Sequence, residues 1–331
     1  MLKSFFSAFL SLLMGLFPWL KTTEPISFTA WLPYWDAENA LAEAERLETQ
    51  LETAVVFAAI FDAEDHPLML PETERLLQSL QRSRDSGVLL SIVNDVQTAP
   101  GIYDNKSPDL LRRLLGDNES VERHIDQLLA LVEHYGLSGL EIDYEAIRKD
   151  EVLWKRFAVF VQELYNRFSE RGLTLRVVLS WDAPKYIALP EGPEYTVMCY
   201  NLYGSHSKPG PKADVAFLEE ICRLYAPYAA HTHMAFATGG FDWGDEKTEA
   251  LTQIQAQKRL RQYGVEPERD EDSGALFGTY AGADGLHTVW YADGSTLALW
   301  RQTVQKWGFE KFDLFRLGGN DWKDLNRSLS H

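Results

Sequence analysis

The sequence predicts a (β/α)8 TIM barrel, a closed ring of eight parallel strands with a helix after each strand. From Ser27 onwards, short runs of β-branched or aromatic residues alternate with longer amphipathic runs, which is typical of repeated strand–helix units around a parallel sheet. Eight such strands can be assigned, and eight is the number that closes this kind of barrel. The length of 331 residues agrees, because α/β barrels of roughly 250 residues or more fold as one domain.

The expected strands are short and rich in aliphatic and aromatic residues. They are Phe28–Tyr34, Ala54–Phe61, Val88–Val93, Leu140–Glu145, Thr174–Ser180, Tyr195–Tyr200, His233–Ala237 and Phe312–Phe315. Between them, apolar residues recur at i, i+3, i+4 and i+7, the spacing of an amphipathic helix. The expected helices are Ala37–Thr49, Glu72–Arg84, Val121–Tyr135, Glu151–Arg171, Lys212–Tyr225, Lys247–Tyr263 and Thr296–Trp307. Gly136 follows the third helix as a glycine stop.

One segment interrupts the rhythm of strands and helices. Residues Ser273–Asp293 read as a hairpin with its turn at Gly282–Gly285. The sequence therefore predicts a small α+β insertion between the seventh and eighth strands, over roughly residues 245–295. Barrel enzymes carry their sites on loops at the carboxyl ends of the strands, so an insertion there is placed to wall a substrate cleft.

The N-terminus carries a separate hydrophobic segment. Phe5–Leu20 is almost wholly apolar and lies between Lys3 and Lys21, which is the length of a signal sequence or of a short membrane span. Since no small-residue cleavage site follows, residues 1–22 are expected to be an uncleaved signal anchor, with a cleaved signal peptide as the alternative. Either interpretation puts the barrel, residues 23–331, outside the cytoplasm.

The composition narrows the possible partners. A formal net charge of −17 repels phosphate backbones, so no nucleic-acid partner is expected. The two cysteines, Cys199 and Cys222, form no disulfide framework, and whether they pair stays open. The sequence has no C-x-x-C pair and no H-E-x-x-H run, so no metal site is expected.

The strongest chemical signal lies on the fourth expected strand, in the run SGLEIDYEAI. Side chains alternate along a strand, so Glu141, Asp143 and Glu145 share one face. Leu140 and Ile142 share the other face and suit the helix side. The three carboxylates should therefore point into the barrel.

Carboxylates held close in a closed interior repel one another, which raises at least one pKa. Glu145 would lie at the carboxyl-terminal rim, where barrel active sites lie. A protonated carboxyl there can donate its proton to a leaving oxygen. The alternative is a structural ion-pair network with Arg148 or Arg176.

The same run resembles the fourth-strand signature of the family 18 glycoside hydrolases (chitinases and related N-acetylglucosaminidases), D-G-x-D-x-D-x-E. Gly139, Asp143 and Glu145 match it, whereas Ser138 and Glu141 replace two aspartates. The resemblance implies that Glu145 is the catalytic acid/base and that Asp143 orients the acetamido group of the substrate. Glu141 keeps the charge of the middle aspartate and is expected at the substrate site.

Other stretches extend the resemblance over most of the chain. TVMCYNLYG looks like the sixth-strand M-x-Y-[DN] element, which implies that Met198, Tyr200 and Asn201 line the sugar site, with the Tyr200 hydroxyl bonding the acetamido carbonyl. FTAWLPYWD is similar to the first strand of the spore-germination and cortex-lytic branch, which implies a substrate contact at Tyr34. That branch often has W-R-L-G after the eighth strand, and Phe315 stands here in the place of the tryptophan that floors the sugar site.

The resemblance implies a hydrolase of β-linked N-acetylglucosamine polymers, peptidoglycan or chitin, that acts by a substrate-assisted, retaining mechanism without a cofactor. The protein is expected to be a monomer. A first alternative is a catalytically weak or inactive glycan-binding barrel in envelope or spore-layer assembly, suggested by the departures at Ser138, Glu141 and Phe315. A second alternative is a two-carboxylate retaining glycosidase, which needs another acid about 5 Å from Glu145. The candidates for that acid are Asp95, Asp182 and Asp242.

Overall fold

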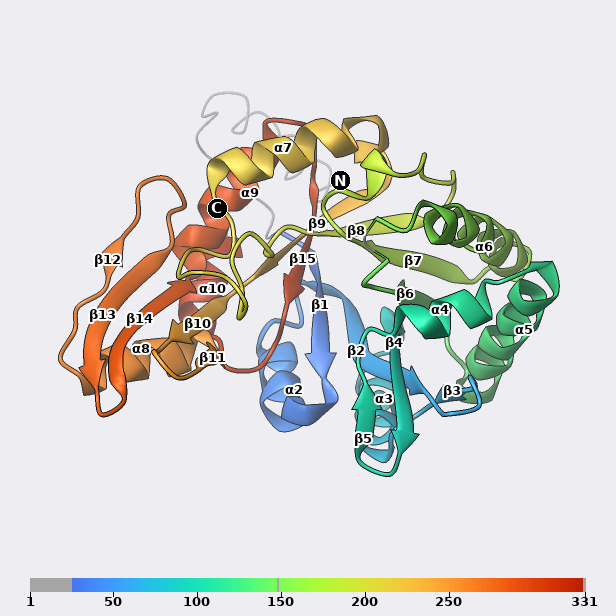
Figure 1. The fold of residues 1–331 in the computed structure, drawn as a ribbon, viewed down its shortest axis with the longest axis horizontal. Coiled ribbons are helices and arrows are strands. Elements are labelled where there is room, and N and C mark those ends of the chain that lie inside the picture. The colour runs from blue at the N-terminus through green and yellow to red at the C-terminus, as the bar shows by residue number, and fades with distance from the viewer. Residues whose placement is uncertain (1–25, 148, 330–331) are drawn as a thin grey trace, which may run out of the picture.

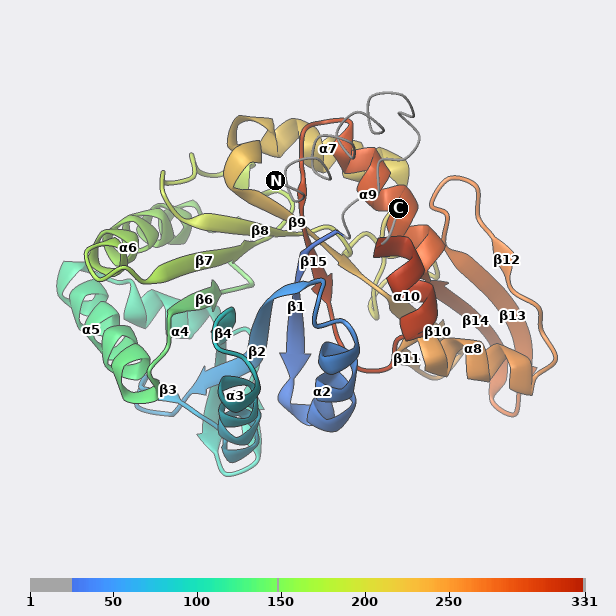
Figure 2. The same ribbon diagram turned by 180° about the vertical axis from the view of Figure 1, so that it is seen from behind.

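The computed structural model describes residues 26–147 and 149–329. Its main sheet is a closed barrel of parallel strands, which confirms the predicted fold class (Figures 1 and 2). The barrel strands are β1 (Phe28–Pro33), β2 (Leu51–Phe61), β4 (Val88–Ala99), β6 (Gly139–Asp143), β7 (Thr174–Leu179), β8 (Glu194–Met198), β9 (Thr232–Ala237) and β15 (Lys311–Phe315). Their order is β2-β1-β15-β9-β8-β7-β6-β4, and pairing of β2 with β4 closes the ring.

Helices surround the barrel on the outside (Figure 1). They are α2 (Ala37–Arg46), α3 (Pro71–Ser83), α4 (Pro108–Leu114), α5 (Asn118–Tyr135), α6 (Glu151–Ser169), α7 (Val215–Tyr225), α9 (Gly294–Gln305) and α10 (Trp322–Leu329). Within the described residues, three short 3-10 turns accompany them, η2 (Tyr34–Asp36), η3 (Ala183–Lys185) and η4 (Ala226–His231). Gly136 ends α5 in the left-handed conformation, at φ 60°, which a residue without a Cβ adopts readily.

The hydrophobic core lies between the outer face of the barrel and these helices. Leu140 and Ile142 of β6 are fully buried there, on the helix side that their alternation with the acidic residues predicted. Inside the barrel is a smaller apolar cluster of Trp31, Val55, Leu89, Val178, Met198 and Ala235. Polar side chains occupy the interior near the strand starts and also line a cavity where the strands end.

One polar group fills the barrel near the starts of the strands. The Arg176 guanidinium is 2% exposed; its Nη2 donates to Asp313 Oδ2 at 2.7 Å and its Nε to Glu141 Oε2 at 3.1 Å. His233 Nδ1 lies 2.8 Å from Asp313 Oδ1. Buried charges persist where each is paired and hydrogen-bonded, so this group is a neutralised structural network.

The segment between β9 and β15 forms a second, antiparallel sheet, which confirms the α+β insertion between barrel strands seven and eight. It contains β10 (Gly239–Trp243), β11 (Thr248–Leu251), β12 (Glu268–Arg269), β13 (Leu276–Gly282), β14 (Gly285–Ala292) and the helix α8 (Gln253–Gln262). β13 and β14 are the expected hairpin, turning between Gly282 and Gly285. The sheet begins at Gly239, ahead of the expected start near residue 245, because β10 pairs directly with β14.

One helix prediction was partly wrong in this region. The start of the expected helix Lys247–Tyr263 forms strand β11 instead, because residues Thr248–Leu251 pair with β10. The helix α8 begins after Thr252, which makes a capping box with Gln255, and such a cap fixes a helix start.

Several shorter elements were not predicted. They are the strands β3 (Pro67–Leu68) and β5 (Ile102–Asp104), which extend the barrel sheet as antiparallel hairpins, and the helices α4 and α10.

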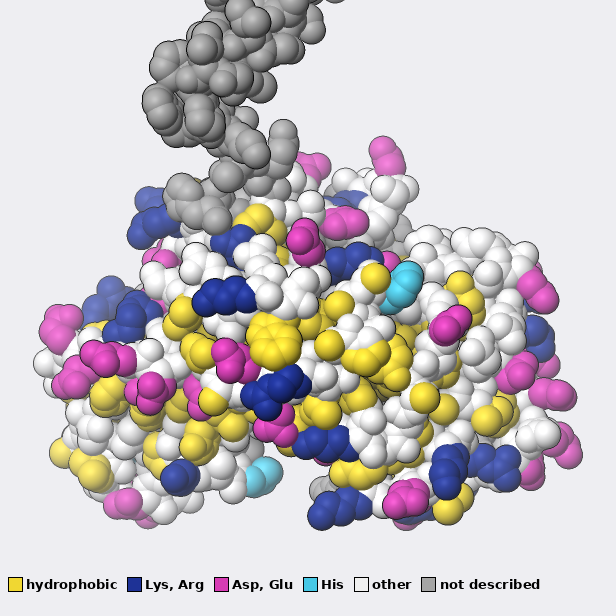
Figure 3. Space-filling model, turned by 90° about the horizontal axis from the view of Figure 1, so that it is seen from above, with side chains coloured by type: hydrophobic (Ala, Val, Ile, Leu, Met, Phe, Trp, Pro, Cys, Tyr) yellow, Lys and Arg dark blue, Asp and Glu magenta, His cyan; other side chains and the backbone are white. Residues whose placement is uncertain are grey.

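The structure also bears on the termini and the cysteines. The signal anchor expected over residues 1–22 lies outside the described residues, and in the described part of the chain no helix is long and apolar enough to cross a bilayer. Cys199 and Cys222 are both buried and unpaired. Within residues 26–147 and 149–329, no cluster of His, Cys, Asp and Glu could hold a metal ion. On the face seen in Figure 3, acidic and basic side chains are interspersed among hydrophobic ones.

Candidate active site

A cavity of about 310 Å³ opens where the barrel strands end. It is lined by Trp31, Trp35, Phe57, Val93, Asn94, Asp95, Lys106, Asp143, Glu145, Val178, Met198, Tyr200, Asn201 and Phe315. Strand β6 ends at Asp143, and Glu145 follows two residues later on the same side. The cavity therefore combines two carboxyl groups of one strand end with a wall of aromatic rings.

The aromatic wall is built around Phe315 at the end of β15. Its ring stacks on that of Tyr200, with centroids 5.6 Å apart and planes at 19°. The ring centroids of Trp31 and Phe57 lie 5.9 and 5.8 Å from the centroid of the Phe315 ring. Apolar faces bordered by polar groups suit a sugar ring, which has C–H faces and hydroxyl edges.

Asp143 is the buried carboxyl of the cavity, at 6% exposure. Burial, and then the charges of Glu145 and Glu141, raise its pKa well above the usual range. Its Oδ1 has no hydrogen-bond partner in the described structure. These conditions favour the protonated carboxyl, with one oxygen free to bond a group that enters the cavity.

Tyr200 offers a hydroxyl to the same cavity. Burial, followed by the charges of Asp143 and Glu145, raises the pKa of Tyr200 well above its usual value. The hydroxyl therefore keeps its proton and can donate a hydrogen bond to a carbonyl oxygen.

Glu145 lies two residues beyond the end of β6, and the side chain of Asn94 holds its backbone in place. Its N–H donates to Asn94 Oδ1 at 2.8 Å, and its carbonyl accepts from Asn94 Nδ2 at 3.1 Å. Asn94 is fully buried. The next residue, Ala146, is in the left-handed region at φ 62°, which is uncommon for a residue with a Cβ. The Asn94 amide thus replaces the sheet ladder as the support of Glu145.

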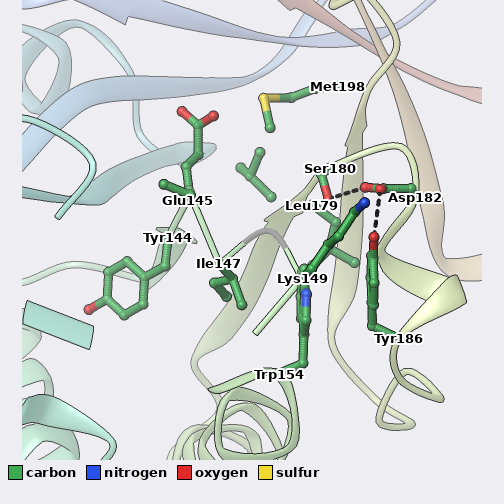
Figure 4. A pocket seen from close by; sticks show the side chains of 12 residues that line it. Tyr144, Glu145, Ile147, Lys149, Trp154, Leu179, Ser180, Asp182, Tyr186 and Met198 are labelled. Carbon is green, nitrogen blue, oxygen red and sulfur yellow. Dashed lines mark hydrogen bonds between the residues drawn. The ribbon is translucent and has the colours of Figure 1, made fainter. Parts of the chain in front are cut away.

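The Glu145 side chain lies where two cavities meet. A second cavity, of about 500 Å³, is lined by Tyr144, Glu145, Ala146, Ile147, Lys149, Trp154, Val178, Leu179, Ser180, Asp182, Tyr186 and Met198. Glu145, Val178 and Met198 line both cavities. Figure 4 shows Glu145 and Met198 at one end of the second cavity and Lys149, Asp182 and Tyr186 at the other. Asp182 accepts from Ser180 Oγ at 2.9 Å.

A carboxyl group between two sugar-sized cavities suits the cleavage of a bond that joins two sugar units, and the comparisons with known proteins agree. The model of glycosyl hydrolases family 18 matches residues 31–313. The chain belongs to glycosyl hydrolase family 18. It is therefore a glycosidase.

Relatives of this family 18 enzyme include a Bacillus subtilis protein described as uncharacterized glycosylase YvbX, 21% identical over 274 residues, with 77% of this chain and 78% of the relative covered. A chitinase structure from Chromobacterium violaceum has a TM-score of 0.77 at 20% identity, covering 92% of this chain and 100% of the other. The spore cortex-lytic enzyme SleL of Bacillus cereus has a TM-score of 0.75 at 18% identity, covering 92% of this chain and 73% of SleL. At these identities the two structures show a shared fold.

The residues expected at the site of the family 18 enzyme divide into two groups. Six of them line the cavity at the strand ends: Asp143, Glu145, Met198, Tyr200, Asn201 and Phe315. The other two, Glu141 and Tyr34, line neither of the two cavities.

Glu141 requires a correction to its expected role. Its carboxylate is fully buried; Oε1 accepts from Trp31 Nε1 at 2.5 Å and Oε2 from Arg176 Nε at 3.1 Å. Burial raises the pKa of Glu141, although the charge of Arg176 opposes this. Glu141 thus belongs to a structural ion-pair network with Arg176, the alternative given for these carboxylates. Its position earlier on β6 puts it below the cavity and beside Arg176.

Tyr34 lies outside the cavity lining, and its neighbour Trp35 lies within it. It packs edge-on against Trp35, with ring centroids 5.1 Å apart, and Trp35 lines the cavity in its place. The expected strand Phe28–Tyr34 ends at Pro33, and η2 begins at Tyr34. Because the chain turns there, the alternation of a strand no longer predicts where the side chains point.

Two polar cavity residues, Asn94 and Lys106, were not anticipated. Asn94 is a polar residue that follows the mostly apolar run Val88–Val93, and that position was a usable signal. Lys106 lies in the loop before α4, and its Nζ is 2.6 Å from Glu145 Oε1. No feature of the sequence points to that contact.

The three candidate second acids have different surroundings. Asp95 lines the first cavity, and its Oδ1 accepts from the Lys106 backbone N–H at 2.7 Å. Asp182 lines the second cavity. Asp242 lies in the insertion, where it accepts from the Tyr280 hydroxyl at 2.5 Å. Asp242 is therefore committed to the insertion sheet and lines neither cavity.

Proposed function

We propose that this family 18 enzyme hydrolyses β-linked N-acetylglucosamine polymers by a substrate-assisted, retaining mechanism with Glu145 as acid/base. The observation that carries the proposal is the position of Glu145 between two cavities, with Asp143 and Tyr200 on the wall of one of them. A glycosidic oxygen at that junction would lie beside Glu145, with the acetamido-bearing sugar on the side of Asp143.

The proposed reaction has two steps. In the first, Glu145 gives its proton to the glycosidic oxygen, the bond from that oxygen to the anomeric carbon breaks, and the acetamido oxygen of the same sugar bonds to that carbon. In the second, Glu145 takes a proton from water, whose oxygen attacks the anomeric carbon and reopens the oxazolinium ring. Two inversions retain the configuration.

Asp143 and Tyr200 would act on the acetamido group rather than on the leaving oxygen. The Tyr200 hydroxyl, which keeps its proton, can donate to the acetamido oxygen. Asp143 has an unbonded Oδ1 and can accept from the acetamido N–H. Groups fixed in advance around a developing charge stabilise the transition state without reorganising.

The substrate class is supported by the names of similar proteins. They include chitinases and a spore cortex-lytic enzyme, and a class V chitinase of Nicotiana tobaccum was solved with NAG4, at a TM-score of 0.72 and 13% identity. We therefore propose chitin or peptidoglycan as the substrate and a site of action outside the cytoplasm. Residues 1–22 as a membrane anchor, residues 23–331 as the enzymatic part and a monomeric state belong to the same proposal.

The test is product analysis with Glu145→Gln. The full chain is incubated with chitin oligosaccharides and with purified peptidoglycan, and products are identified by mass spectrometry. We expect new reducing-end N-acetylglucosamine from one substrate, and a loss of about a hundredfold or more in rate for Glu145→Gln, since positioned acid–base catalysis contributes that much. Glu119→Gln, on the exposed side of α5, is the matched control. Hydrolysis that persists in folded Glu145→Gln would contradict the assignment.

The alternative of an inactive glycan-binding barrel has one structural observation in its favour. The middle carboxylate of the motif, Glu141, is held in an ion pair with Arg176 and is withdrawn from the cavity. Binding of both polymers by the folded wild-type protein, with cleavage of neither, would favour that alternative.

A further inference from the structure

Lys212 is a cation at the edge of the first cavity. It lies in the loop between β8 and α7 and is half-buried. Its Nζ is 5.9 Å from the centre of the Tyr200 ring and 5.3 Å from the centre of the Phe241 ring, on β10 of the insertion. Within residues 26–147 and 149–329, no carboxylate forms an ion pair with this ammonium, and the one charge that shifts its pKa is that of Arg316.

The lack of a counter-charge makes the ammonium of Lys212 unfavourable in this place. Burial, and then the charge of Arg316, lower the pKa of Lys212 to about 8. The two aromatic rings offset part of this cost, because an ammonium within about 6 Å of a ring centre is attracted to the ring face. A carboxylate would offset more, since a hydrogen bond between two charged groups is roughly twice as strong as one between neutral groups.

Arg316 has the partner that Lys212 lacks. Its Nη1 donates to Asp36 Oδ2 at 2.7 Å, and its Cζ lies 6.0 Å from the centre of the Trp35 ring, which lines the first cavity. Asp36 is therefore committed to Arg316. The charge of Lys212 is left for a group that the described part of the chain does not supply.

The place of Lys212 beside the cavity indicates what that group would be. Tyr200 lines the first cavity, and its hydroxyl is the proposed donor to the acetamido oxygen of the bound sugar. Since Lys212 lies over the same ring, a substituent of that sugar or of the next sugar in the strand can reach the ammonium. The sugars of chitin carry only neutral substituents. In peptidoglycan, every second sugar carries a lactyl ether that ends in a carboxyl group.

We propose that Lys212 is a specificity-determining residue that binds the carboxylate of a lactyl-substituted sugar, so that the enzyme prefers acid-bearing glycan strands of the peptidoglycan type to chitin. The proposal rests on the proposed function, because it places the glycan in the first cavity. It adds a contact to the substrate and none to the reacting atoms.

A purely structural role for Lys212 is the competing explanation. Its two ring contacts join the barrel to the insertion. A lysine that only braced this junction would affect every substrate equally, whereas a carboxylate-binding lysine affects the acidic substrate alone. The two roles therefore differ in the ratio between two substrates.

The experiment compares two glycans of equal length. One is the N-acetylglucosamine tetramer, and the other is the alternating tetramer of N-acetylglucosamine and N-acetylmuramic acid with free lactyl carboxyl groups. The dissociation constants are measured in Glu145→Gln by tryptophan fluorescence, because Trp31 and Trp35 line the cavity, and kcat/KM replaces them for any protein that cleaves the tetramers. We expect the acidic tetramer to be preferred about tenfold, since a hydrogen bond to a charged group contributes about that much.

Substitutions at Lys212 test the origin of this preference. Lys212→Met keeps the length of the side chain and should abolish the preference without weakening binding of the neutral tetramer. Lys212→Arg keeps the charge and should retain the preference. Lys258→Met, an exposed lysine on α8 of the insertion, is the control and should also retain it. An equal loss of affinity for both tetramers in Lys212→Met would overturn the proposal.

A chemical control does not depend on the folding of any Lys212 variant. Conversion of the lactyl carboxyl groups to methylamides keeps the size of the substituent and removes its charge, so the preference should disappear while Lys212 is intact. A preference that survives this conversion would overturn the role of Lys212.

The outcomes also separate this proposal from the proposed function. An acid preference that depends on Lys212, without cleavage of either tetramer by the wild-type protein, would overturn only the proposed function. Cleavage of both tetramers with equal kcat/KM would uphold the proposed function and overturn the role of Lys212.

Discussion

At the scale of single residues, the position of Glu145 depends on Asn94 more than on the strand. The Asn94 amide makes the two bonds to the Glu145 backbone that a neighbouring strand would otherwise supply. Since reacting groups must be held to within a fraction of an ångström, loss of these bonds should slow the chemical step more than it weakens binding.

Asn94→Ala tests this dependence. We expect kcat to fall about ten- to a hundredfold with a much smaller change in KM, because Glu145 would no longer be fixed although the sugar cavity is retained. Asn94→Asp can still accept from the Glu145 N–H and should lose less activity. Steady-state kinetics on the substrate identified by product analysis gives both constants, and thermal unfolding checks the fold. Equal changes in kcat and KM for both variants would argue against a positioning role.

The alternation of side chains along the fourth barrel strand predicted part of the candidate active site but not all of it. It correctly put Asp143 and Glu145 at the cavity and Leu140 on the helix side. It could not tell that Glu141 lies deep enough to pair with Arg176, because alternation reports the face of a strand and not the depth along the barrel. Lys106 escaped prediction because loop geometry delivers it.

At the scale of elements, the insertion is held together by a buried charge. Asp242 on β10 accepts from the Tyr280 hydroxyl on β13 at 2.5 Å and lies 2.9 Å from His287 Nδ1 on β14. Arg259 of α8 bonds the same carboxylate. Asp242 therefore ties two strands and the covering helix together, and it is 2% exposed.

Asp242→Ala should loosen the insertion selectively. Removing one partner of a buried ion pair leaves the others uncompensated, which costs about 3 kcal/mol or more. We expect faster amide hydrogen exchange over residues 239–292 and little change in the barrel strands. Glu246→Ala, an exposed acid in the same segment, should leave exchange unaltered. Uniform loss of protection across the whole chain would show instead that the insertion and barrel unfold as one unit.

Helices and strands were predictable where the residues within each element determine its structure. The long helices α5 and α6 carry clear amphipathic spacing and capping aspartates, and both were predicted. The short helix α4 begins with a Ser107 cap and Pro108, a start signal that was present, but its seven residues are too few to show a period. Strand β11 depends on pairing with β10, which local sequence does not reveal.

At the scale of the whole molecule, the two ends of the barrel have different roles. The paired charges near the strand starts stabilise the closed ring, while the less completely paired groups at the strand ends are available for chemistry. The rhythm of strands and helices predicted closure, because eight parallel strands leave no free edge. The same pattern could not predict that paired charges lie near the strand starts and reactive groups at the strand ends, since Arg176 and Asp313 meet only after the barrel closes.

The charges near the strand starts also make the stability of the molecule depend on pH. Burial opposes protonation of His233, but the charge and hydrogen bond of Asp313 and the hydrogen bond to Glu194 outweigh it and raise the pKa above 6.5. A group with a raised pKa contributes its full stabilisation below the unfolded value and loses it as the pH rises through the folded value. His287 in the insertion also has a raised pKa, through Asp284 and Asp242 against the effect of burial.

We therefore expect the free energy of unfolding to decline as the pH rises above about 6.5, by at most about 1.4 kcal/mol per pH unit for each histidine that titrates. Urea unfolding of the full chain at a series of pH values measures this slope. His233→Gln should be less stable than the wild type on the acid side and should show a shallower decline. The exposed His206, replaced in the same way, should leave the slope unchanged. Burial lowers the pKa of Lys212 to about 8, which opposes the decline above that pH. A wild-type stability that stays level between about pH 6.5 and about pH 8 would therefore mean that proton uptake at His233 and His287 does not differ between the folded and unfolded chain.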